Sequence, residues 1–155
     1  MNVPQLALRS LLILALGTGA AQASTLIDAS NPQQVLEIAK GFGSAELGTD
    51  DVGDPNIVGR IDGTKYGVYF YGCKNGRDCT ALQFSAGWSG VATNLTEINA
   101  WNRDNRFAKA FLDNDGDPRL EMDINADHGI TRDNLEDSFE WWQVCLQQFN
   151  AQVLQ

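Results

Sequence analysis

The sequence predicts an α+β domain: a single antiparallel sheet with helices packed on one face, in the element order α-β-β-β-α-β-β-α. Two patterns support this prediction. Apolar and polar side chains alternate over 119–124, which is the period of a half-buried strand. The C-terminal segment instead repeats apolar side chains at helical spacing, at Leu135, Phe139, Trp142, Cys145, Leu146, Phe149 and Val153.

Residues 1–23 are predicted to be a cleavable signal peptide. Arg9 precedes an apolar run over 11–21, and Ala21-Gln22-Ala23 has the small-x-small pattern that signal peptidase cleaves. The run is about half as long as the roughly 20 residues that span a bilayer. We therefore expect cleavage after Ala23 and one domain over 24–155, located in the periplasm or secreted.

The first half of this domain is expected to begin with a helix at Asn31-Pro32, because Asn caps helices well and Pro suits the first helical position. The helix should end near Gly41 or Gly43. The polar, Gly-rich and acidic stretch 44–56 predicts an exposed loop. Three strands are then expected over 57–61, 65–71 and 81–85, with Asp62-Gly63 as the first turn.

The second half is expected to open with a helix at Asn94-Leu95-Thr96-Glu97, which resembles a capping box. A hairpin should follow, with strands over 107–112 and 119–124 joined around the Asp115-Gly116 turn. Thr131 is expected to cap the last helix.

Cys73 and Cys79 flank a short connection between two expected strands. A three-residue loop at 75–77 places them opposite each other and within disulfide reach. A two-residue loop would instead pair Cys73 with Asp78 and misalign the sulfur atoms. We expect a disulfide in an oxidising compartment, and a buried free thiol at Cys145.

Catalytic and metal sites are not predicted. His128 is the only histidine, so a zinc site at the cysteine pair lacks ligands. No Ser lies near His128 in sequence to form a nucleophile–base pair. Asp113, Asp115 and Asp117 alternate as calcium ligands do. A calcium loop, however, needs Gly at the position of Pro118 and a bidentate Glu at the position of Ile124. This run is interpreted as a turn, and no cofactor is expected.

The stretch 101–123 resembles the bacterial YbjN-domain family, and the resemblance covers roughly 31–153. Members of this family are labelled as sensory transduction regulators. The order of elements is also similar to that of class I type III secretion chaperones. The resemblance implies a family and a fold, but it implies no particular chemistry.

Four residues match the family's Trp-Asn pair and basic cluster: Trp101, Asn102, Arg103 and Arg106. In a structural interpretation the Trp is in the core, the Asn caps a helix, and an Arg pairs with Glu121 or Asp123 on the surface. In a functional interpretation they form a recognition patch, since interfaces favour aromatic residues and Arg.

Trp141 and Trp142 offer a further candidate. Neighbouring residues on a helix point about 100° apart, so both side chains cannot face one core. If Trp142 belongs to the apolar stripe, Trp141 lies at its edge and is exposed enough to contact a partner.

Net charge narrows the class of partner. The chain carries a formal charge of −9, and loss of Arg9 with the signal peptide makes it more negative. Such a protein is repelled by nucleic acid and anionic membranes. We expect a non-enzymatic, chaperone-like or regulatory module that contacts an unknown protein, or a second copy of itself as a homodimer. The alternative is a small carboxylate-based hydrolase or carbohydrate-binding protein.

Overall fold

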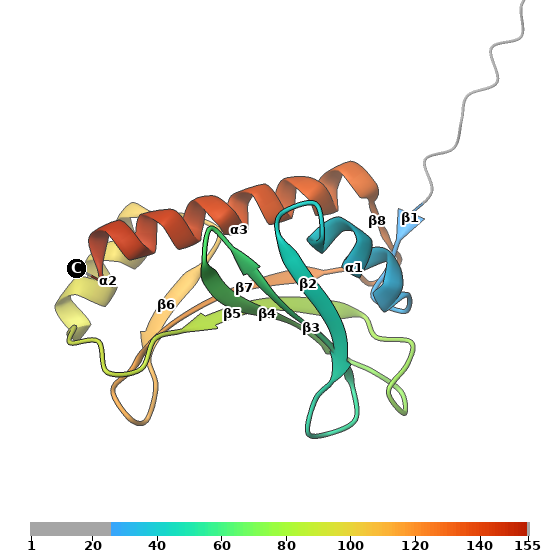
Figure 1. The fold of residues 1–155 in the computed structure, drawn as a ribbon, viewed down its shortest axis with the longest axis horizontal. Helices are drawn as coiled ribbons and strands as arrows, with labels where there is room; N and C mark the ends of the chain where they lie inside the picture. Colours follow the sequence, from blue (N-terminus) through green and yellow to red (C-terminus); the bar gives the residue numbers. More distant parts are fainter. Residues whose placement is uncertain (1–25, 155) are drawn as a thin grey trace, which may run out of the picture.

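The computed structural model describes residues 26–154, so the expected signal peptide lies outside the described residues. Helices separate runs of consecutive strands along this part of the chain (Figure 1). In chain order they are β1 (Leu26–Ile27), α1 (Pro32–Ala39), β2 (Ser44–Thr49), β3 (Pro55–Ile61), β4 (Thr64–Tyr71), β5 (Ala81–Gly87), α2 (Leu95–Asp104), β6 (Lys109–Leu112), β7 (Pro118–Asn125), β8 (Ile130–Thr131) and α3 (Arg132–Gln152).

The main sheet is antiparallel and has six strands in the order β2-β3-β4-β5-β7-β6. β1 and β8 form a separate two-stranded sheet that the sequence did not predict. The α+β class and the antiparallel sheet are as predicted. β5 pairs with β7 instead of β6, because β6 folds back along the outer side of β7.

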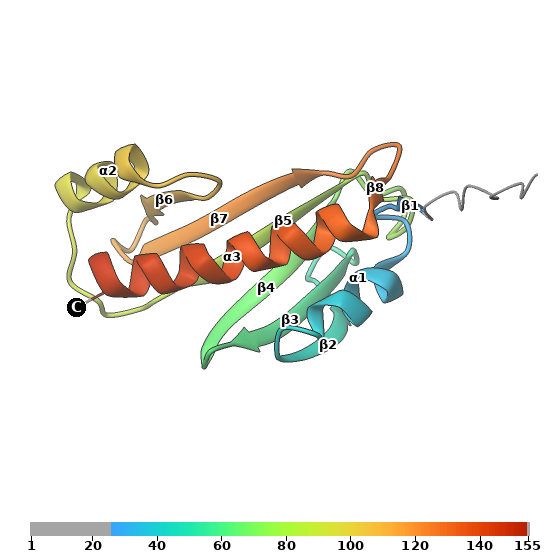
Figure 2. The same ribbon diagram turned by 90° about the horizontal axis from the view of Figure 1, so that it is seen from above.

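Helices α1 and α3 cover the same face of this sheet (Figure 1). The apolar stripe of α3 faces the strands, and its Phe139 and Trp142 are fully buried. Phe139 meets Phe84 of β5 edge-on, with ring centroids 4.7 Å apart. Helix α2 lies beside β6 (Figure 2), where Trp101 packs against Phe149 of α3. Burial of these aromatic side chains supplies much of the hydrophobic stabilisation.

The stretch 44–56 is not the exposed loop that its composition predicts. β2 pairs with β3 from Ser44 opposite Arg60 to Thr49 opposite Pro55. Composition misled because most side chains of β2 are exposed, so this edge strand shows no apolar alternation. Main-chain pairing with β3 forms the strand instead.

The turn between β2 and β3 spans only 50–54. The Asp50 carboxylate accepts the N–H groups of Val52 and Asp54, at 3.0 and 2.9 Å. The main chain closes the turn through the Asp50 N–H, which donates to the Asp54 carbonyl. Gly53 has a φ of 93°, a left-handed conformation that favours glycine.

The turn between β6 and β7 repeats this arrangement. The Asp113 carboxylate accepts the N–H groups of Asp115 and Asp117, at 3.1 and 3.0 Å, and Gly116 has a φ of 82°. Asp113 therefore organises a turn, as its interpretation from the sequence requires. Of the two residues in the expected Asp115-Gly116 turn, Gly116 alone has a positive φ.

The turn between β3 and β4 is attached to α3. The Asp62 carboxylate accepts amide N–H groups from Gln143 and Gln147, at 2.8 and 2.9 Å. These hydrogen bonds, that from Gln143 first, lower the pKa of Asp62 because they favour its charged form. Asn150 of α3 donates to the Thr64 hydroxyl at 3.2 Å. These contacts fix α3 across the sheet.

Candidate functional site

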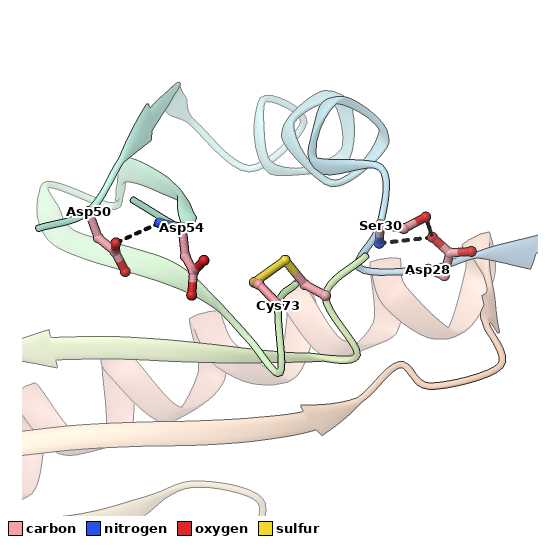
Figure 3. Close-up of a disulfide and its surroundings, with 6 residues drawn as sticks. Asp28, Ser30, Asp50, Asp54 and Cys73 are labelled. Carbon is pink, nitrogen blue, oxygen red and sulfur yellow. Dashed lines mark hydrogen bonds between the residues drawn. A yellow bond between two sulfur atoms is a disulfide. The ribbon is translucent and has the colours of Figure 1, made fainter. Parts of the chain in front are cut away.

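Cys73 and Cys79 are joined by a disulfide, with Cα atoms 3.8 Å apart (Figure 3). The three-residue loop favoured by the sequence is wrong. Lys74 and Arg77 exchange main-chain hydrogen bonds around the two residues between them, which is a two-residue turn. The sulfur atoms still meet because Asp78, with a φ of 50°, is an additional residue on one side.

The disulfide lies between the 50–54 turn and the segment at Asp28 and Ser30 (Figure 3). The Cys73 loop rests on that turn, since a Cβ placed on Gly76 would lie 2.7 Å from the Gly53 carbonyl oxygen. The disulfide thus closes the connection between β4 and β5, which lies at one end of the sheet.

Two of the four family-cluster residues stabilise α2. Trp101 is 2% exposed and packs in the core. Asn102 does not cap the helix, as the structural interpretation expected. Its side-chain amide donates to the Ala110 carbonyl at 2.9 Å and accepts the Ala110 N–H at 2.8 Å. Asn105 follows the helix instead and donates its N–H to the Trp101 carbonyl.

The two arginines of the cluster do not pair with strand carboxylates. Arg103 makes two 2.8 Å hydrogen bonds to its neighbour Asp104, and both side chains are exposed. The Arg106 guanidinium lies over the Phe107 ring, 5.4 Å from its centroid. Such a contact is a cation–π interaction.

Lys109, and neither of the two arginines, pairs with the carboxylates of β7. Its ammonium group lies 3.1 Å from Glu121 and 3.5 Å from Asp123. Hydrogen bonding to Glu121 is the largest cause of the raised pKa of Lys109, because it favours the charged form. Lys109 thus offsets part of the negative charge of β7.

Trp141 and Phe107 form an exposed aromatic pair. Their ring centroids lie 4.4 Å apart at an interplanar angle of 33°, and the residues are 38% and 52% exposed. Trp142 is fully buried, so the predicted division between the two tryptophans is confirmed. Phe107 was not predicted as a site residue. It was assigned to a strand, whereas it has a φ of 72° and precedes β6.

Cys145 fixes the loop that carries Phe107. It lies one helical turn after Trp141, is 1% exposed, and its thiol donates to the Arg106 carbonyl at 3.5 Å. Burial raises the pKa of the Cys145 thiol, so it remains a neutral donor. The prediction of a buried free thiol is confirmed.

A groove lies beside the aromatic pair, between α3 and β7. Its volume is about 310 Å³, and its walls include Phe107, Trp141, Met122, Ile124, Asp123 and Asp137. We call it the α3–β7 groove. It combines an apolar floor with Asp137, whereas the Asp123 side chain points to the opposite face of the sheet, where its carboxylate accepts the Gln83 amide N–H at 2.7 Å. Of the sequence-predicted candidates, only Trp141 lines the groove. Arg106 contacts the ring of Phe107, which is another lining residue.

His128 lies in the connection between β7 and β8. Its side chain is 92% exposed, and its Nε2 atom lies 3.6 Å from the Asp127 carboxylate. Across residues 26–154, no three His, Cys, Asp or Glu side chains are grouped as metal ligands. In the same part of the chain, none of the helices combines the length and apolar character that crossing a membrane requires.

Comparison with known proteins identifies the family. The family model of YbjN, described as "Putative bacterial sensory transduction regulator", matches residues 31–155, so the chain belongs to the YbjN family. No curated protein matches it in sequence.

Two solved structures are similar to this one in fold. The crystal structure of YbjN from E. coli, titled a putative transcription regulator, has a TM-score of 0.52 and 18% identity, over 86% of this chain and 99% of that one. The Yersinia pestis type III secretion chaperone SycH, in complex with a stable fragment of YscM2, has a TM-score of 0.43 and 19% identity. That match covers 75% of this chain and 97% of the other.

Proposed function

We propose that this YbjN-family protein is an exported, non-enzymatic binding module that contacts another protein at the α3–β7 groove. The observation that carries the proposal is the exposed pair of Phe107 and Trp141. Large aromatic side chains beside an Arg are typical of the residues that dominate binding energy at interfaces. Here they border a groove of suitable size for a partner's apolar side chains.

The aromatic pair is also held in place before any partner binds. Trp141 projects from α3, while Phe107 contacts both Trp141 and the Arg106 guanidinium. The Cys145 thiol fixes the main chain at Arg106. Side chains that are already ordered lose little conformational entropy on binding, which favours affinity.

Export is part of the proposal and rests on the predicted signal peptide over 1–23. The disulfide between Cys73 and Cys79 supports it, because such bonds persist in oxidising compartments. A mature chain beginning at Ser24 would carry the whole YbjN-matching region. Intact-mass measurement on protein from an envelope fraction tests this step, and a mass that retains residues 1–23 would contradict it.

An exported protein regulates or chaperones by binding its partners directly. In this proposal the family's description as a sensory transduction regulator therefore applies here as contact with another protein. Contact with a protein partner in the periplasm agrees with either a regulatory or a chaperone-like role. The partner is a different protein or a second copy of this chain.

Trp141→Ala tests the proposed function. The variant and the wild type are cross-linked in a periplasmic extract and the captured proteins are quantified. Leu95→Ala is the matched control, because Leu95 is another exposed apolar residue, 63% exposed, on a different helix. We expect capture to fall with Trp141→Ala and to remain with Leu95→Ala. Equal capture by all three proteins would refute the groove as the contact site.

Carbohydrate binding is a second candidate, because Trp141 lies in one groove with Asp137. Sugar rings stack on such aromatic platforms, and carboxylates accept their hydroxyl groups. Titration of tryptophan fluorescence with soluble oligosaccharides tests this function. A saturable change that is lost in Trp141→Ala would favour it over protein contact.

A further inference from the structure

The outer strand β6 covers only half of β7. Their pairing runs from Leu112 opposite Pro118 to Lys109 opposite Glu121 and ends there. β7 continues to Asn125, paired with β5 on its other side. Figure 2 shows no strand alongside this second half of β7. The sheet therefore has an open edge over 122–125.

The main-chain groups of this edge have a definite direction. Both main-chain groups of Ala110 bind the Asn102 amide, so they point away from β7. In an antiparallel ladder this direction alternates from residue to residue, so Lys109 exchanges hydrogen bonds with Glu121. Two residues further along, the main-chain N–H and C=O groups of Asp123 point the same way as those of Glu121, toward the side that β6 no longer covers.

Asn125 shares this outward direction. The neighbouring Ala126 donates its N–H to the Thr80 carbonyl, on the β5 side, so Asn125 must face the opposite side. Asp123 and Asn125 thus present N–H and C=O groups at the open edge. Exposed edges of this kind bind extended chains by adding a strand.

The α3–β7 groove lies directly beside this edge, on the helix-covered side of the sheet. A strand added next to β7 would direct every second side chain into the groove, since side chains alternate between the faces of a sheet. Those side chains would contact Ile124 and cover Trp141 and Phe107. The open edge and the exposed aromatic pair would be buried together.

Charge selects the occupant. Asp137 lines the groove, and on the opposite face of β7 the carboxylates of Glu121 and Asp123 outnumber the single ammonium group of Lys109, which lies 3.1 and 3.5 Å from them. Two copies of this edge placed together would bring like charges into contact, which costs free energy. A segment with Lys or Arg beside its apolar residues is complementary.

We propose that an extended, basic segment of a protein partner, with apolar residues alternating with Lys or Arg, binds as an added strand along 122–125 of β7. This inference rests on the proposed function and specifies its binding mode and partner chemistry. Main-chain hydrogen bonds at Asp123 and Asn125 hold the segment. Its apolar side chains enter the α3–β7 groove.

The probe is a synthetic peptide of about nine residues, the length of a long strand, in which Ile alternates with Lys. Binding to the mature protein is measured by titration, and amide hydrogen exchange is followed residue by residue. We expect the Asp123 and Asn125 amides to exchange at least about tenfold more slowly when the peptide is bound, because each gains a hydrogen bond. The same peptide with Glu in place of Lys should bind more weakly.

Asn125→Pro removes one edge N–H, and it should weaken peptide binding about fivefold, the effect of one hydrogen bond. Asn125→Ala is the matched control, because it removes the side chain and keeps the N–H. It should bind like the wild type. If Asn125→Pro does not fold, the exchange measurement on the wild-type protein decides alone.

Leu47→Pro controls for the other edge of the sheet. Asp50 faces Asp54 across the β2–β3 turn, so by alternation the Leu47 N–H points outward from β2. Leu47→Pro should leave peptide binding unchanged. Loss of binding, or of self-association, in this variant alone would place the added strand on β2 and overturn the proposal.

The two proposals can fail separately. If Trp141→Ala weakens binding while Asn125→Pro does not, and the edge amides stay unprotected, the groove binds proteins but strand addition is wrong. If Trp141→Ala leaves both peptide binding and capture from the extract unchanged, the groove is not the contact site. The proposed function then fails, and the strand-addition proposal that rests on it fails too.

Discussion

The β2–β3 and β6–β7 hairpins form the two edges of one sheet and close with the same turn, Asp-x-x-Gly-Asp-Pro. They differ in how far the outer strand extends. β2 pairs along its whole length of 6 residues, whereas β6 has 4 residues and leaves half of β7 open. A turn sequence sets how a hairpin closes. Contacts of the outer strand with the rest of the molecule set where its pairing ends.

The pairing of β6 ends where Phe107 leaves the strand direction with a φ of 72°. On the outer side of β6, Asn102 of α2 binds both main-chain groups of Ala110 and so anchors the strand. β2 instead pairs with β3 from Pro55 to Arg60, one residue short of the end of its partner strand. The two edges also differ in charge. Arg60 and Lys65 outnumber Glu46 in the hollow beside β2, whereas the α3–β7 groove is lined by Asp137 and by no Lys or Arg.

Trp142→Ala should have the largest effect, because Trp142 packs in the core that α3 and the sheet share. Trp142 is fully buried, and its ring centroid lies 5.6 Å from that of Phe84 on β5. Truncation should cost about 3–5 kcal/mol of unfolding free energy. Urea unfolding measures this, and a cost below about 1 kcal/mol would show that the buried side of α3 is misassigned.

Asn102→Ala should affect the two hairpins differently. It removes two hydrogen bonds and leaves the Ala110 N–H and C=O without partners, which should cost about 2 kcal/mol. Amide exchange should become faster in β6 and stay unchanged in β2. Asn114→Ala, in the exposed β6–β7 turn, is the control. Equal acceleration in both edge strands would show that α2 does not anchor β6.

Asp50→Ala and Asp113→Ala should have similar effects, because each removes one carboxylate that accepts two N–H groups. We expect a cost of about 1 kcal/mol for each substitution. Asp50→Asn and Asp113→Asn keep an acceptor oxygen and should recover most of it. Thermal melts of the four variants measure these differences. A clearly larger cost at one turn would show that the two turns are not equivalent.

The sequence predicted one of these hairpins and missed the other, although both carry the same turn. The β6–β7 hairpin was recognised from the apolar alternation of Leu120 and Met122, which face the core. In β2, Ala45 alone is buried, so its residues look like a loop. A strand at a sparsely covered edge has no apolar period to detect, and a turn motif without flanking alternation was not enough.

The candidate site was predictable only in part, for a similar reason. Helical geometry separates Trp141 from Trp142, and the structure confirms that division. The role of Phe107 depends on a contact with α3 and on a left-handed main chain, and no Gly or Pro nearby signals it. The contact between Asn102 and Ala110 joins positions whose proximity follows only from the folded edge.

Trp141→Ala should have the smallest effect on stability, and its effect should stay local to the β6 edge. An exposed aromatic pair contributes about 0.5–1.5 kcal/mol, and Trp141 is 38% exposed, so we expect a loss of about 0.5–1 kcal/mol. The double variant with Phe107→Ala should cost less than the sum of the single variants, because both remove the same ring contact. Urea unfolding of the three variants gives this coupling energy. Strict additivity would mean that the two rings do not stabilise each other, and a pair without such coupling would not be the ordered contact surface on which binding at the α3–β7 groove depends.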